Sequence, residues 1–63
     1  MEIKGRLIRL REATGLDQYE LAKRAGMSPS QLNRYERGKS RPTLPTLERL
    51  ARALRVRVSD LFW

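Results

Sequence analysis

Apolar residues recur every three or four positions in separate stretches of the chain, and glycines or prolines divide these stretches. Such spacing is typical of amphipathic helices. It predicts a first helix over residues 2–13 and a fourth that begins near residue 43. The apolar stripes of these two helices contain Ile3, Leu7 and Leu10, and then Leu47, Leu50, Ala51 and Leu54. A last short turn or helix, capped by Ser59 and containing Leu61, Phe62 and Trp63, completes an all-α prediction: a compact bundle of four helices plus a short fifth, with no strand.

Two shorter helices are predicted between residues 17 and 38, joined by a tight turn at Gly26. Asp17 has the residue type of an N-cap and opens the first of them. Ser28 followed by Pro29 is an equally clear start for the second, which Gly38 ends. Two helices joined this tightly form a rigid angled unit, a helix-turn-helix, whose second helix fits the major groove of DNA while the first braces it.

The charge balance indicates which kind of molecule the protein binds. Among 63 residues, 14 Lys and Arg oppose 7 Asp and Glu, which gives a net charge of +7. An excess of positive charge favours a polyanionic partner, most simply nucleic acid. The length predicts one domain over residues 1–63, too small for an enclosed catalytic cleft.

The residue types exclude other classes of function. The chain has no Cys and no His, so a Cys/His zinc site is excluded and no metal, cofactor or small-molecule ligand is expected. The Ser and Asp residues fall at helix caps and form no nucleophile–base constellation, so we expect no enzyme activity. No apolar run spans a membrane and the first residues lack the pattern of a signal peptide, which favours the cytoplasm.

The run QYELAKRAGMSPSQLNRYERG, residues 18–38, has a specific spacing: Ala22 lies four residues before Gly26, and Leu32 six after it. A small residue, a turn glycine and an aliphatic residue at these places let two helices pack closely. Together with the later runs TLERLARALRV and SDLF, the chain resembles the helix-turn-helix domain of the lambda-repressor and Cro family, the XRE family of bacterial and phage regulators. The resemblance covers nearly the whole chain and implies a bacterial or phage-encoded, nucleoid-associated protein that binds double-stranded DNA.

The resemblance assigns an expected role to each group of residues. Candidates for reading base edges lie on the third helix: Pro29, Ser30, Gln31, Asn33 and Arg34. Ser30 and Arg34 are the strongest of these, because they lie one turn apart and arginine can pair bidentately with guanine. Candidates for phosphate contacts are Gln18, Arg37, Lys39, Ser40 and Arg41. An ion pair between Arg11 and Glu36 is expected to hold the first and third helices together.

One small module buries little surface on DNA, so tight binding would need two copies, and we expect a homodimer. The expected activity is that of a transcriptional repressor on a palindromic operator with half-sites about 34 Å apart. The candidate dimer surface consists of Val56, Val58, Leu61, Phe62 and Trp63, although Leu61 and Phe62 are also candidates for closing the core. The alternative is an antitoxin-type module that pairs with a toxin and binds its own operator. In that case the arginine-rich face of the fourth helix and the Trp63 end would contact the toxin.

Overall fold

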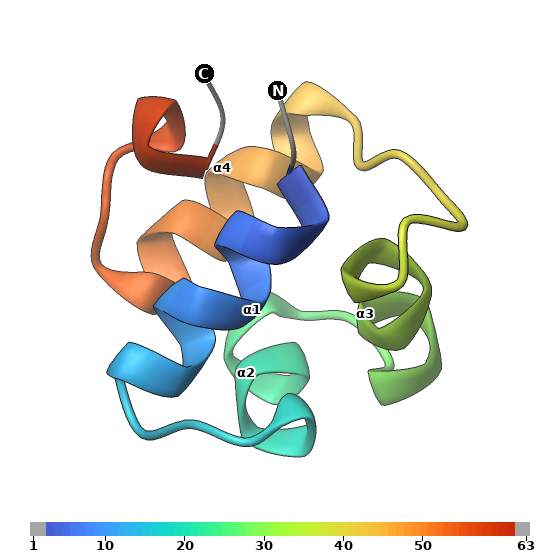
Figure 1. Cartoon of the computed structure of the whole chain (residues 1–63), viewed down its shortest axis with the longest axis horizontal. Coiled ribbons are helices and arrows are strands. Elements are labelled where there is room, and N and C mark those ends of the chain that lie inside the picture. Colours follow the sequence, from blue (N-terminus) through green and yellow to red (C-terminus); the bar gives the residue numbers. More distant parts are fainter. Residues whose placement is uncertain (1–2, 62–63) are drawn as a thin grey trace.

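The computed structural model describes the backbone of residues 3–61 and the side chains of residues 5–61. Over this range the chain forms four α-helices and one 3-10 helix (Figure 1). These are α1 (Ile3–Ala13), α2 (Gln18–Ala25), α3 (Pro29–Glu36), α4 (Leu44–Leu54) and η1 (Val58–Leu61). No strand occurs in the described range, so the predicted all-α bundle with a short fifth element is confirmed.

The starts of α2 and α3 have the caps that the sequence predicts. The Oδ1 atom of Asp17 accepts a hydrogen bond from the backbone N–H of Glu20 at 2.8 Å. In the same way the Oγ atom of Ser28 accepts from the N–H of Gln31 at 3.1 Å, with Pro29 as the first helical residue. Each cap satisfies an N–H group that the helix itself leaves without a partner. The two helices of the motif therefore begin at residues fixed by local chemistry.

The last element differs from its prediction. Ser59 lies inside η1 and does not cap it. The Oδ2 atom of Asp60 accepts instead from the N–H of Arg57, at 2.9 Å. Asp60, the third residue of the turn, reaches back to the N–H of the residue that precedes the turn, as the acidic residue of a capping box does. Phe62 and Trp63, which the sequence places in the same element, lie outside the described residues.

All four α-helices end in the same way. At the end of α2, the N–H of Met27 donates to the carbonyl of Ala22 at 2.9 Å and the N–H of Gly26 donates to Lys23 at 3.2 Å. This pair of bonds is the Schellman motif, which needs a left-handed residue, and Gly26 supplies it at φ 72°. The left-handed residues after α1, α3 and α4 are Gly15, Gly38 and Arg55. Arg55 is the exception, because it carries a β-carbon at a position that favours glycine.

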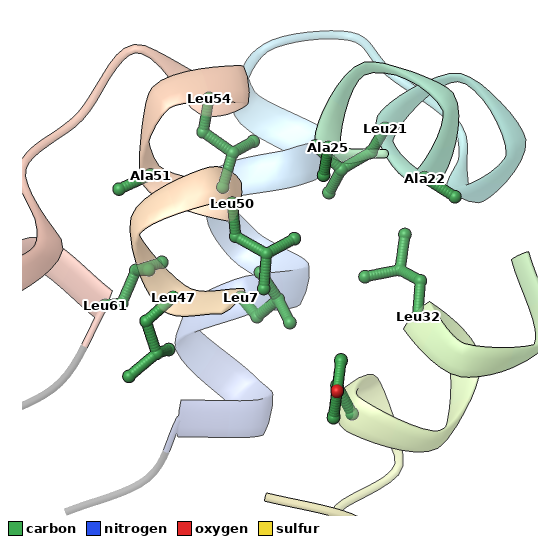
Figure 2. Close-up of a cluster of buried hydrophobic side chains, with 11 residues drawn as sticks. Leu7, Leu21, Ala22, Ala25, Leu32, Leu47, Leu50, Ala51, Leu54 and Leu61 are labelled. Atoms are coloured by element: carbon green, nitrogen blue, oxygen red, sulfur yellow. The ribbon is translucent and has the colours of Figure 1, made fainter. Parts of the chain in front are cut away.

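The core lies where α2 meets α3 on one side and α4 on the other. Its largest fully buried side chains are leucines that come from every helix (Figure 2): Leu7, Leu21, Leu32, Leu50, Leu54 and Leu61. Ala22 and Ala25 are also buried and keep the α2 backbone close to its neighbours. Leu32 projects from α3 toward α2 and fills the space between them. This packing fixes the angle of α3 and leaves its other face on the surface.

Candidate nucleic-acid interface

The surface of α3 opposite the core carries the residues predicted to read bases. Leu32 and Tyr35 are buried, whereas Pro29, Ser30 and Arg34 are exposed. Ser30 and Arg34 are four residues apart, so they lie one above the other on one helix face. Gln31 is half-buried beside them. The structure therefore places Ser30 and Arg34 on one exposed ridge, with the half-buried Asn33 on its other side and Pro29 at the start of the helix.

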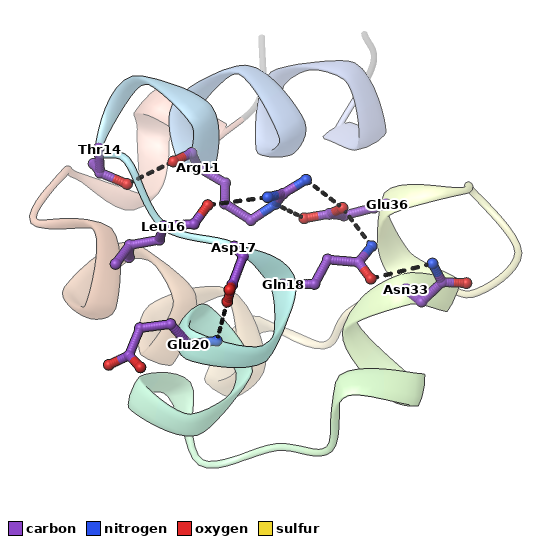
Figure 3. A network of polar contacts seen from close by, with 8 residues as sticks. All are labelled: Arg11, Thr14, Leu16, Asp17, Gln18, Glu20, Asn33 and Glu36. Carbon is purple, nitrogen blue, oxygen red and sulfur yellow. Dashed lines mark hydrogen bonds and ion pairs between the residues drawn. The ribbon is translucent and has the colours of Figure 1, made fainter.

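The buried carboxylate of Glu36, at the C-terminal end of α3, anchors this helix to the rest of the molecule (Figure 3). Glu36 is 3% exposed. Its Oε2 atom accepts a hydrogen bond from Arg11 Nε at 2.7 Å, and its Oε1 atom accepts from Arg11 Nη2 at 3.3 Å. The Nη1 group of Arg11 also donates to the carbonyl of Leu16 at 3.0 Å. The predicted ion pair is thus present, and it also ties down the loop between α1 and α2.

Two amide side chains extend this network to the start of α2. The Nε2 atom of Gln18 donates to Glu36 Oε1 at 2.8 Å, and its Oε1 atom accepts from Asn33 Nδ2 at 3.4 Å. The network therefore joins α1, α2 and α3 (Figure 3). In the part of the chain that the structure describes, every buried side-chain nitrogen and oxygen has a hydrogen-bond partner. Satisfied polar networks of this kind hold helices in one relative orientation.

The network includes two residues with predicted DNA contacts, Asn33 and Gln18. Asn33 uses one amide hydrogen on Gln18, so a base contact would be made by its second amide hydrogen or its Oδ1 atom, with the side chain held in place by that bond. A phosphate contact by Gln18 remains a prediction. One Nε2 hydrogen is engaged with Glu36, so the donors for this contact are the second Nε2 hydrogen and the backbone N–H groups at the start of α2. Sequence spacing gives no signal for the bond between Asn33 and Gln18, because it depends on side-chain orientation across two helices.

The turn and loop after α3 carry the remaining candidates for phosphate contacts. Arg37, Lys39 and Arg41 are exposed. Ser40 is half-buried, and its Oγ atom accepts a hydrogen bond from Arg34 Nε at 3.1 Å. That bond directs the guanidinium of Arg34 and leaves both terminal nitrogens out of the interaction. The structure therefore connects the predicted phosphate ligand Ser40 to the predicted base reader Arg34.

The C-terminal candidates for a dimer surface separate into three groups. Val56 and Val58 are half-buried and pack against the core, with part of each side chain on the surface. Leu61 is 0% exposed, so it offers no surface to a second copy and its place in the predicted dimer surface is wrong. Its apolar side chain packs between α1 and α4, since η1 folds back on both. Phe62 and Trp63 lie outside the described residues.

No group of three or more His, Cys, Asp or Glu residues within the described side chains could hold a metal ion. None of the described helices has the length and apolarity needed to cross a membrane.

The geometry defines a class: a helix-turn-helix DNA-binding domain, with a capped and exposed second helix held by a buried network. The family model described as Helix-turn-helix matches residues 7–61, and the chain belongs to this family, in its lambda-repressor and Cro-like branch of transcriptional regulators.

Curated relatives and solved structures agree with this assignment. The chain is 34% identical over 61 residues to the Cryptic phage CTXphi transcriptional repressor RstR of Vibrio cholerae, which covers 97% of this chain and 54% of that protein. It is 48% identical over 48 residues to the HTH-type transcriptional regulator y4dJ of Sinorhizobium fredii, covering 76% of this chain and 62% of that one. The chain thus spans just over half the length of these curated relatives.

Among solved structures, the restriction-modification controller protein C.AhdI from Aeromonas hydrophila superposes with a TM-score of 0.94 at 36% identity, covering 97% of this chain and 92% of that one. The clp gene regulator ClgR from C. glutamicum gives a TM-score of 0.90 at 28% identity, covering 95% and 78%. These similarities extend over nearly the whole described fold.

Proposed function

We propose that this protein is a sequence-specific transcriptional repressor that binds a palindromic operator as a homodimer. The observation that carries the proposal is the exposed ridge of α3, with Ser30 and Arg34 at its centre, held rigidly by the buried Glu36 network. A ridge held this firmly can enter the major groove without reorganising, which favours reading of base edges. The repressor relative supports the direction of the regulatory effect.

Two kinds of contact divide the work on DNA. Arg34 and Ser30 read base edges, and Arg34 pairs with a guanine through the two terminal nitrogens that its bond to Ser40 leaves available. Arg37, Lys39 and Arg41 flank α3 on the exposed turn and loop, where they neutralise phosphates and set the register of the protein on the duplex.

The homodimer follows from the size of the reading surface. A single module buries about 600–1,000 Å² on DNA, whereas typical specific affinities require more. Val56 lies two residues before η1 and Val58 is its first residue, and the exposed parts of their side chains supply part of the surface between the two copies. Two copies related by a two-fold axis would place their α3 helices in major grooves about 34 Å apart.

Selection of bound duplexes from a randomised DNA library, with the mass of the complex measured by sedimentation, tests this function. The proposal expects an enriched palindrome whose half-sites are separated by about one helical turn, bound by two copies. Failure to enrich any motif would contradict sequence-specific binding. An enriched motif without symmetry, bound by a single copy, would contradict the homodimer alone.

A further inference from the structure

A groove lined with arginines runs between the C-terminal halves of α2 and α4. It consists of two adjoining hollows of about 310 Å³ each, which share Arg24 and Ala53 as lining residues. Arg49 and Arg52 line one hollow, and Arg55 lines the other. We define the arginine groove as these four arginines around the half-buried Ala53. Its floor is apolar and its rim is cationic.

The carboxylates of the chain pair with only one arginine of this rim within the described residues. Arg24 forms an exposed ion pair with Glu20, with 3.1 Å between Nε and Oε2. Within the described residues, no ion pair or hydrogen bond holds the side chains of Arg49, Arg52 and Arg55. Arg49 and Arg52 are three residues apart on α4 and Arg55 directly follows the helix, so their like charges repel one another. The groove therefore has three guanidinium groups available to an outside partner.

The backbone at Arg55 is a second, independent observation. Arg55 adopts φ 60° and ψ 42°, the left-handed conformation, at the end of α4. The other three α-helices use glycine at this position, and glycine would remove the strain that the arginine β-carbon introduces. The carboxyl-end dipole of α4 favours a cation nearby, but it does not require one at the strained position itself. Strain that is retained at a surface residue points to a role for its side chain.

The position of the groove separates it from the proposed DNA surface. In Figure 1 the C-terminal half of α4, in orange, lies on the left of the molecule, and α3 lies on the right. α4 packs mainly against α2 and η1, whereas α3 packs against α1 and α2. A duplex held by α3 would therefore leave the groove accessible.

We propose that the arginine groove binds an acidic amphipathic segment of another protein. Carboxylates of the segment pair with Arg49, Arg52 and Arg55, since guanidinium groups bind carboxylates bidentately. An apolar side chain of the segment covers Ala53. A second copy of this chain is a poor occupant, because its own groove carries the same charge. A DNA duplex is also a poor occupant, because its broad convex surface does not enter hollows of about 310 Å³.

Fluorescence anisotropy with a labelled synthetic peptide tests the proposal on the free protein, independently of any DNA binding. The probe is a helix-patterned peptide of leucine and glutamate, and the control peptide replaces each glutamate with glutamine. The test variant is Arg49→Gln/Arg52→Gln. The matched control variant, Arg9→Gln/Arg57→Gln, removes two exposed arginines outside the groove. We expect the test variant to bind the acidic peptide about fivefold to tenfold more weakly than the control variant does.

Three results would overturn the proposal. Equal weakening in the two variants would mean that the peptide senses only the net charge of the protein. Equal binding of the glutamine peptide would mean that carboxylates are not recognised. Displacement of the acidic peptide by an operator duplex would place the groove in the DNA footprint. Thermal unfolding of both variants at the temperature of the unaltered protein shows that they are folded, as expected for exposed side chains.

Discussion

Replacing Glu36 with glutamine tests how much the buried network that joins α3 to α1 and α2 stabilises the fold. The substitution Glu36→Gln preserves the shape of the side chain and removes its charge. In the native protein the carboxylate accepts hydrogen bonds from Arg11 Nε at 2.7 Å, Arg11 Nη2 at 3.3 Å and Gln18 Nε2 at 2.8 Å. In the variant, the guanidinium of Arg11 keeps its charge but faces a neutral amide.

The size of the effect follows from burial. Removing one partner of a buried ion pair typically costs about 3–5 kcal/mol, because the other charge is left unpaired. The side chain of Arg11 is 15% exposed and that of Glu36 is 2% exposed. Since Arg11 retains some water and its bond to the Leu16 carbonyl, we expect a loss at or below the lower end of this range, about 2–3 kcal/mol. In a domain this small, that loss lowers the melting temperature by roughly 8–24 °C.

Thermal and urea unfolding followed by circular dichroism measure this loss. Glu20→Gln is the matched control, because its carboxylate pairs with Arg24 on the exposed surface and should contribute only a few tenths of a kcal/mol. A double-mutant cycle with Arg11→Met should show an interaction energy of about 1–3 kcal/mol. Equal destabilisation by Glu36→Gln and Glu20→Gln, or an additive cycle, would show that the buried Arg11–Glu36 pair contributes no more to stability than an exposed pair does.

Three further predictions concern the ends of α3 and α4 and the positive charge of the protein's DNA-binding surface. Ser28→Ala removes the cap of α3 and should reduce the free energy of unfolding by about 1 kcal/mol, and an unchanged urea midpoint would show that the cap is dispensable. Arg55→Gly relieves the left-handed backbone after α4 and should stabilise the protein by roughly 1 kcal/mol; a lower melting temperature would mean that the arginine side chain stabilises the fold. Operator affinity measured between about 50 and 200 mM salt should fall with a log–log slope of roughly −4 to −5, if a dimer neutralises about four to six phosphates. A flat dependence would contradict phosphate contacts by Arg37, Lys39 and Arg41.

The parts of the fold that were predictable are those set by neighbouring residues. Asp17 and Ser28 cap their helices because a short polar side chain can reach an N–H three residues later in the chain. Gly26 marks the turn because the Schellman motif needs a left-handed residue there. The exposure of Ser30 and Arg34 follows from helical spacing relative to Leu32. These signals are local, so they can be read without the rest of the structure.

The features that could not be predicted depend on distant packing. The hydrogen bond from Arg34 to Ser40 forms only because the loop after α3 folds back on the helix. Leu61 is buried because η1 returns to α1 and α4, and its residue type alone fits either a core or an interface. The left-handed backbone conformation of Arg55 could not be predicted from the sequence, because helices that end in a left-handed residue usually have glycine there. Apart from the Arg11–Glu36 pair, which the family resemblance implies, side-chain partners across elements must therefore be taken from the structure.

Whether α3 reads the DNA sequence is decided by comparing the affinities of Arg34→Ala and Arg41→Ala for the selected operator and for each of its single base-pair variants. Arg34→Ala should abolish the preference at one base pair of each half-site, a loss of about 1–3 kcal/mol of discrimination there. Arg41→Ala should weaken binding to every sequence by the same factor, as expected for a phosphate contact. Uniform weakening by Arg34→Ala, with every base preference retained, would contradict the claim that the exposed ridge of α3 reads the sequence.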